Sequence, residues 1–483
     1  MQSKNRGKLF IENFLIYGLG GTISRFIPMI MLPVITRLYP NSEYIGLNDL
    51  STTFISFVAA LAVCGMYDAM FRLFFDKSEI SFQKQVCSTA FVFVSCTTVL
   101  LTFLLLMFKR HVAIWFFGSE RYETLVIITL IGFLVNATNQ IVSAPTRIQN
   151  KRKIFLITNT LSPVISYSLA IPLILNGYYL YAIPLATIVS GFTMELSFWF
   201  LNKKFFSFKC FNFTRFKELL LIGIPLMPNF IVYWIYNSAD KVMIAQLLGN
   251  SYTGVYSVAS KIGHISNLLY TAFAGGWSYF AYTTMNDNDQ VQLKADIFEY
   301  LGVISFACTV ALTSISRVGF KILFTEEYFL GYLVAPYLFL APLLLMLYQV
   351  IANQFTIIKK TYLNLLALSL GAVLNIIINL VMIPKVGIEG ASIATVLGYI
   401  LSLLVCSILL KYKKLIKINK KVYFNIAVFI VYFLLWRLFL HNRIVISIFL
   451  GIVTEILYLF MYKNSLLKIL QAKILKKKQR EEV

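Results

Sequence analysis

Two cations lie deep inside apolar stretches of this sequence and are its strongest candidates for chemistry. Arg25 lies in an apolar run over residues 10–35, and Lys261 lies in another over residues 252–281. At 1.5 Å per residue, Arg25 is roughly 15 Å from the nearer end of its run, too far for its guanidinium to reach an interface easily. A cation at the centre of a membrane costs about 2.5–3.5 kcal/mol on insertion scales and usually marks a pathway or a buried pair. We therefore expect both side chains to face a cavity and attract an anion.

Polar residues at three- and four-residue steps follow the same helices, as expected if one face of each helix lines the cavity. One stripe contains Ser257, Lys261, His264, Asn267 and Thr271. The other contains Asn229, Tyr233, Asn237 and Asp240 at the end of the run over residues 218–238. The predicted ligand-binding residues of the cavity are Arg25, Lys261, Ser257, His264, Asn229, Tyr233 and Asn237.

A purely structural interpretation competes with this one. Arg25 and Lys261 could each pair with a buried acid, such as Asp68 or Glu195, and only lock helices together. Asp68, Glu195 and Asp240 could instead carry coupling protons or sodium ions, or be ordinary helix-end charges. The three histidines and six cysteines are dispersed along the chain, so we expect no metal site and no cofactor.

The elements that must position these residues are membrane-spanning helices. The chain is 59% hydrophobic and 13% charged, whereas a soluble domain is about 45–50% apolar and about 25% charged. Apolar runs of roughly 20 residues, long enough to cross a bilayer as helices, recur along the whole chain. The sequence predicts an all-α polytopic membrane protein with about fourteen spans. These spans cover residues 10–35, 46–70, 85–107, 122–144, 154–175, 178–201, 218–238, 252–281, 297–316, 331–353, 361–383, 387–410, 422–440 and 443–462.

The basic residues indicate the orientation of these spans. With the N-terminus inside, 31 of the 43 lysines and arginines fall in inner segments and nine fall in outer loops. Cytoplasmic loops carry such an excess, so both termini are expected in the cytoplasm. The formal charge of +22 is then explained by loop placement, and no nucleic-acid partner is expected. The membrane lipid is the partner of these basic loops.

An internal repeat divides the chain. Gly46 recurs as Gly254 at an offset of 208 residues, and Gln140 recurs as Gln349 at an offset of 209. A third match, between segments 186–189 and 394–397, has the same offset of 208. Matches in order at one offset favour a true repeat of six helices. The predicted domains are a six-helix lobe over 1–205, a second six-helix lobe over 206–415, helices thirteen and fourteen over 416–463, and a basic cytoplasmic tail over 464–483.

Loose motifs in a fixed order give the chain a family resemblance. They are Pro33-x-x-Thr36-Arg37, Gly65-Met66-Tyr67-Asp68-Ala69-x-Phe71-Arg72, Arg147-x-Gln149-Asn150-Lys151, Asn237-x-x-Asp240-Lys241 with Gly254-Val255-Tyr256-Ser257, and Gly387-x-x-Gly390-Ala391-x-x-Ala394-Thr395. With these motifs the chain resembles the Wzx-type polysaccharide and O-antigen flippases of the multidrug/oligosaccharidyl-lipid/polysaccharide (MOP) exporter superfamily.

The resemblance implies two six-helix lobes around a central cavity, a fold like that of the multidrug and toxic-compound extruders. It further implies that the chain moves an undecaprenyl-pyrophosphate-linked oligosaccharide for lipopolysaccharide synthesis across the bacterial inner membrane by alternating access. An association with the polysaccharide polymerase machinery would fit such a role. The chain would be a transporter and not an enzyme.

Two other functions are weighed against this one. A multidrug extruder would share the repeat but usually has twelve helices and an acidic cavity, and two extra helices and a cationic interior count against it. A membrane sugar polymerase or ligase would need a long outer loop with Arg, His or carboxylates. The longest predicted outer loop, residues 108–121, is too small for that.

Overall fold

The computed structural model describes residues 26–285, 287–413 and 415–481, and they form helices and no strand. The first helix in this part of the chain is Phe26–Leu38. The helices of the N-terminal half are α2 (Ser42–Val63), α3 (Met66–Leu73), α4 (Ile80–Met107), α5 (Lys109–Phe117), α6 (Glu123–Ile148), α7 (Arg152–Leu175) and α8 (Ala182–Asn202). Those that follow are α9 (Phe213–Gly223), α10 (Met227–Trp234), α11 (Asp240–Leu247), α12 (Asn250–Gly263), α13 (Asn267–Thr283), α14 (Gln290–Leu323), α15 (Gly331–Ile357), α16 (Tyr362–Val386), α17 (Ile388–Tyr412), α18 (Lys420–Leu435) and α19 (Ile444–Glu481).

Twelve helices within the described residues are long and apolar enough to cross a membrane. Two more predicted spans also coincide with helical chain. The first is described only from Phe26 onward, and the eighth consists of α12 and α13 joined by a short 3-10 turn. Their outer faces carry many exposed aliphatic and aromatic side chains, which lipid would cover. The chain is therefore a multi-pass membrane protein, as predicted.

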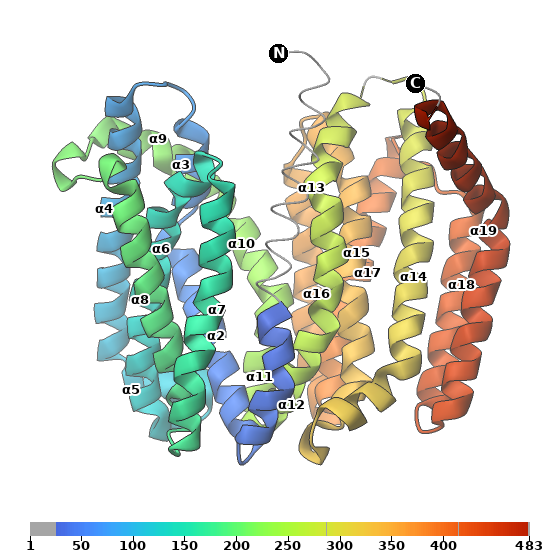
Figure 1. Cartoon of the computed structure of the whole chain (residues 1–483), viewed down its shortest axis with the longest axis horizontal. Coiled ribbons are helices and arrows are strands. Elements are labelled where there is room, and N and C mark those ends of the chain that lie inside the picture. Colours follow the sequence, from blue (N-terminus) through green and yellow to red (C-terminus); the bar gives the residue numbers. More distant parts are fainter. Residues whose placement is uncertain (1–25, 286, 414, 482–483) are drawn as a thin grey trace.

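The helices form two lobes, which Figure 1 shows side by side. One hydrophobic cluster fills the lobe of α2–α8, and a larger cluster fills the lobe of α12–α17. Some residues near the junction of the lobes belong to the hydrophobic cluster of the opposite lobe. Leu32 and Ile35 of the first helix belong to the larger cluster, whereas Leu219 of α9 belongs to the cluster of the N-terminal lobe. Each lobe thus packs on a segment that the repeat assigns to the other.

The seventh span runs from α9 to α11 and is irregular. A 3-10 turn, η4 (Ile224–Leu226), separates α9 from α10, at the pair of prolines Pro225 and Pro228. Proline removes a backbone donor and clashes with the preceding turn, so a break here is expected. A π-helical segment, η5 (Ile235–Ala239), then leads into α11. Such segments are rare and often lie at functional sites.

The last two helices pack on α14 at the far edge of the second lobe (Figure 1). The Tyr462 hydroxyl donates to Glu299 at 2.9 Å, and the Tyr432 and Ser314 hydroxyls lie 2.8 Å apart. Arg437, in the π-helical segment η8 (Trp436–Leu440) after α18, donates from Nη2 to Glu389 Oε2 at 2.7 Å. This intramembrane arginine is therefore neutralised within the protein and holds α17 and α18 together.

Candidate functional site

The site is built where α2 and α12 cross, because glycine lets their backbones meet. A Cβ on Gly46 would lie 2.2 Å from the Asn250 carbonyl oxygen, and a Cβ on Gly254 would lie 1.9 Å from the Ser42 carbonyl oxygen. Both distances are shorter than any real contact of a Cβ atom. The two contacts are equivalent under the 208-residue offset, so the repeat meets itself here. Gly46 and Gly254 occupy matching positions at the crossing.

One turn along from the crossing, a cluster of charges joins α2, α11 and α12. The Asp49 carboxylate accepts hydrogen bonds from Lys241 Nζ and from Ser257 Oγ, both at 2.8 Å. Lys261 Nζ lies 3.8 Å from the other carboxylate oxygen. The side chains of Asp49 and Lys241 are 10% and 14% exposed, whereas that of Lys261 is 46% exposed. Two lysines share the Asp49 carboxylate, and the buried Asp240 directly precedes Lys241 in α11. Lys261 is therefore the exposed charge of the cluster.

The structure brings together only part of the predicted site. Ser257 and Lys261 meet in the charge cluster, and His264 follows within one turn, with Nδ1 3.5 Å from Ser260 Oγ. Arg25 lies outside the described residues. The acidic partner of Lys261 is Asp49 and neither of the acids that the sequence suggested. Asp49 and Ser257 differ by 208 residues, so the repeat offset was the signal that could have revealed this contact.

The prediction from the sequence placed Lys241 wrongly. The predicted seventh span ended at residue 238, which put Lys241 in an outer loop. In the structure the span continues to Leu247, and Lys241 is largely buried beside Asp49. The π-helical segment and a paired charge extend this helix beyond the apolar run that marked it in the sequence.

The other predicted residues of the seventh span lie one to three turns before Lys241. Tyr233 packs at the edge of the larger hydrophobic cluster. Asn237 is exposed, and its amide donates to the Tyr233 carbonyl of its own helix at 2.7 Å. Asn229 is partly buried on α10. These three residues therefore add neutral polar groups, and Asp240 supplies the carboxylate of the stripe.

Two neighbouring cavities of the N-terminal lobe share lining residues, and we refer to them together as the groove. The first has a volume of about 270 Å³ and reaches Asp68 and Tyr67 at the start of α3. The second, of about 240 Å³, extends between α2, α6 and α8 to Asn48. Thr52, among others, lines both cavities. Arg147, at the end of α6, donates to the Tyr67 hydroxyl at 3.1 Å, so two of the sequence motifs meet at the mouth of this groove.

Comparison with known proteins was made on sequence and on structure. Residues 34–330 match the family described as "Polysaccharide biosynthesis protein". The chain therefore belongs to this polysaccharide biosynthesis family. The family predicted from the motifs is thereby confirmed. No curated protein matches the sequence.

Solved structures with the same fold come from the MOP superfamily. The lipid II flippase MurJ in an inward closed conformation gives a TM-score of 0.73 at 16% identity, covering 94% of this chain and 100% of that chain. An inward-facing multidrug resistance MATE family transporter gives 0.60 at 16% identity, with coverages of 81% and 97%. A MOP superfamily transporter from Pyrococcus furiosus gives 0.54 at 14% identity, with coverages of 84% and 95%. The predicted MATE-like fold is thus confirmed.

In this polysaccharide biosynthesis protein, hydrogen bonds close the two lobes at one end. Glu327, just before α15, accepts from Ser42 N at 2.7 Å and from Ser42 Oγ at 2.6 Å. Asn250 donates to the Phe117 carbonyl at 2.9 Å. Ser42 and Asn250 are equivalent positions of the repeat, and each is held by a loop of the opposite lobe. This end forms a reciprocal clamp.

The three predicted coupling acids lie in different surroundings. Asp240 is 4% exposed, and its carboxylate accepts from the Tyr256 hydroxyl and from the Lys241 backbone N–H. Asp68 is exposed at the groove mouth. Glu195 is partly buried on α8 and bonds to Thr138. Of these, Asp240 is the one enclosed between lobe elements.

A line of neutral oxygen and amide groups continues from Asp240. Thr395 contacts the Tyr256 hydroxyl and accepts from Asn375 Nδ2 at 3.2 Å, and Asn379 Nδ2 donates to Asn375 Oδ1 at 3.2 Å. The buried Asn379 Oδ1 has no hydrogen-bond partner among the described residues. The groups could coordinate a monovalent cation or relay a proton, since oxygen ligands suit hard cations.

Proposed function

We propose that this protein is a flippase that moves an undecaprenyl-pyrophosphate-linked oligosaccharide across the bacterial inner membrane by alternating access. The observation that carries this proposal is the charge cluster between the lobes, where Lys261 stays half exposed beside a lysine that Asp49 already neutralises. The exposed ammonium of Lys261 suits an anionic headgroup and disfavours a cationic drug. Membership of a polysaccharide biosynthesis family supports a glycan as cargo.

The pyrophosphate would bind by competing with Asp49. Lysine is a point charge with three donors and engages phosphate oxygens from several directions. An approaching pyrophosphate would bind Lys261 first, because its ammonium is the exposed one. Because Asp49 competes with the headgroup for the lysines, the affinity for the headgroup stays limited and its release remains fast. A carrier needs this balance, because an overly tight complex cannot complete its cycle.

The Gly46–Gly254 crossing would belong to the end that opens and closes, because these glycines lie against Ser42 and Asn250, the residues of the clamp. In alternating access the lobes rock around a fixed site near the middle of the membrane. The clamp of Ser42 with Glu327 and of Asn250 with Phe117 lies at the end expected to face the periplasm, given cytoplasmic termini. Breaking it would open the cavity outward. The prenyl chain would stay in lipid throughout, so only the polar headgroup crosses through protein.

We further propose Asp240 as the residue that couples the cycle to a proton or sodium gradient. It is buried at the base of the charge cluster, and it is linked through Tyr256 to helices α16 and α17. Binding of a proton or a sodium ion to Asp240 would alter how α11 packs against those helices. Asp68 and Glu195 are less suited because neither connects the two lobes.

The function can be tested with Lys261→Ala. We expect its affinity for undecaprenyl pyrophosphate to fall about 10- to 100-fold, because a charge-assisted hydrogen bond contributes about 1.5–3 kcal/mol. Translocation of a fluorescently labelled lipid-linked oligosaccharide in proteoliposomes should fall with it. Lys261→Arg should retain much of both activities, since the charge is kept.

The matched control is Lys385→Ala, which removes an exposed lysine elsewhere in the same protein. It should leave binding and translocation unchanged. Normal translocation by Lys261→Ala at normal protein level would refute the role of the charge cluster.

A further inference from the structure

The groove of the N-terminal lobe is lined by apolar side chains and by neutral hydrogen-bonding groups. Its two cavities contain the amides of Asn136, Asn139 and Gln140 and the hydroxyls of Thr52 and Thr187. The one charged residue that lines them, Asp68, lies at the mouth. A groove of this composition suits a ligand that carries many hydroxyl or amide groups and no charge.

Two asparagines, Asn48 and Asn139, line the second cavity of the groove. Asn48 Oδ1 and Asn139 Oδ1 are buried and have no hydrogen-bond partner within the described residues. Asn48 is only 6% exposed, and its amide nitrogen is already committed to the Tyr39 hydroxyl at 3.0 Å. Both side chains add polar character to the wall of this cavity.

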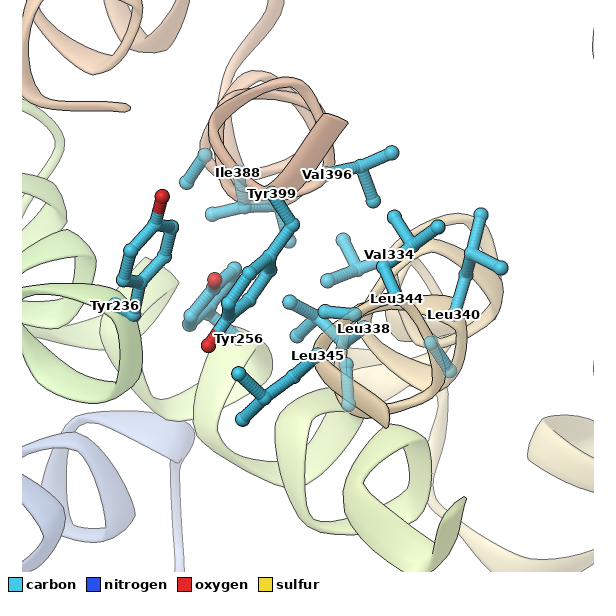
Figure 2. Close-up of a cluster of buried hydrophobic side chains, with 14 of the residues drawn as sticks. Tyr236, Tyr256, Val334, Leu338, Leu340, Leu344, Leu345, Ile388, Val396 and Tyr399 are labelled. Atoms are coloured by element: carbon cyan, nitrogen blue, oxygen red, sulfur yellow. The ribbon is translucent and has the colours of Figure 1, made fainter. Parts of the chain in front are cut away.

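The equivalent place in the second lobe is filled. By the repeat offsets, Asn48 corresponds to Tyr256, Asn136 to Leu345 and Gly191 to Tyr399. The larger residues are buried and pack into a solid core of aromatic and aliphatic side chains, and the Tyr236 ring stacks on Tyr399 at 4.0 Å (Figure 2). Small or amide residues keep the first lobe open at the same positions. The groove is therefore a property of one lobe and not a by-product of the fold.

The groove begins beside the charge cluster. Asn48 directly precedes Asp49, so α2 presents one residue to the groove and the next to Lys241 and Ser257. A ligand whose anionic group binds at Lys261 could therefore place its adjoining polar part in the groove. The aliphatic side chains of Ile55 and Ile188 also line it and could pack on the C–H face of a ring.

From this geometry we infer that the N-terminal groove is the binding subsite for the uncharged sugars next to the pyrophosphate of the lipid-linked oligosaccharide. The inference rests on the proposed function and deepens it. Sugar hydroxyls would exchange hydrogen bonds with the amides of Asn136 and Gln140 and with the hydroxyls of Thr52 and Thr187, which line the groove. Selectivity for the glycan then resides in α2, α6 and α8, and the second lobe contributes charge and coupling.

The test uses Asn136→Leu, which installs the second lobe's residue at an exposed position of the groove. Binding to the purified full-length protein is measured with two probes, undecaprenyl pyrophosphate and the undecaprenyl-pyrophosphate-linked oligosaccharide extracted from cells that produce it. We expect the wild-type protein to bind the glycosylated lipid more tightly. Asn136→Leu should lose about tenfold in affinity for that lipid, comparable to losing one or two hydrogen bonds, and bind undecaprenyl pyrophosphate unchanged.

Two further variants separate the outcomes. Thr187→Val, on the opposite wall of the groove, should act in the same direction as Asn136→Leu. Thr193→Leu, on an exposed part of α8, should bind both probes as the wild type does. If the groove variants keep the full preference for the glycosylated lipid, or if the wild type has no such preference, the subsite is wrong while the flippase function stands. If the wild type binds neither probe, the proposed function itself fails.

Discussion

At the scale of single residues, Asp49 decides how strongly the charge cluster attracts an anion. Asp49→Asn keeps the hydrogen-bonding shape but removes the negative charge that Lys241 and Lys261 share. At an effective dielectric of about 20, a unit charge at 4 Å contributes about 4 kcal/mol. We therefore expect pyrophosphate affinity, measured by calorimetry, to rise on the order of tenfold or more, while translocation slows because release is delayed.

The double variant Asp49→Asn/Lys241→Gln provides the control, because it restores the net charge of the cluster. Its affinity should return toward that of the wild type. The single variant should also unfold at a lower temperature, since an unpaired buried lysine remains and breaking a buried pair costs about 3–5 kcal/mol. Unchanged affinity in Asp49→Asn would contradict competition between this carboxylate and the headgroup.

At the scale of elements, the α2–α12 crossing depends on glycine. Gly254→Ala would place its Cβ 1.9 Å from a backbone oxygen of Ser42, and neither backbone can yield without separating the helices. We expect a loss of about 1–3 kcal/mol or more in stability, seen as a lower unfolding temperature, together with loss of translocation. Gly319→Ala in α14 has open space around it and should be neutral or up to about 1 kcal/mol stabilising. Equal effects of the two substitutions would argue against the crossing as a close contact that transport needs.

At the scale of the whole molecule, the reciprocal clamp sets which end is closed. Glu327→Ala removes the acceptor for the Ser42 backbone N–H at the start of α2, where Asn41 makes no side-chain cap. Loss of a helix cap costs about 0.5–2 kcal/mol. We expect faster hydrogen–deuterium exchange at residues 42–46 and 250–254. The control is Glu326→Ala at the exposed neighbouring residue, which should leave the exchange rates unchanged. If both variants exchange at the same rates, the clamp does not hold this end closed.

Much of the architecture followed from the sequence alone. Apolar runs and their lengths predicted the twelve long membrane helices of the described residues, because a span must satisfy its own backbone hydrogen bonds and face lipid whatever its neighbours are. The 208-residue offset predicted two related lobes, and the Gly46–Gly254 contact agrees with it. The membership of Lys261 and Ser257 in one polar stripe was also predictable, since helical periodicity is a local property.

The partners of those polar residues were decided by tertiary structure. Asp49 escaped notice because one carboxylate among apolar residues has no local pattern, and its lysines come from helices about 200 residues away in the chain. Lys241 was placed in a loop because only its pairing with Asp49 makes its burial favourable. The open groove of one lobe and the filled core of the other likewise depend on how helices pack, since volume left between side chains is a property of three elements meeting and not of any one of them.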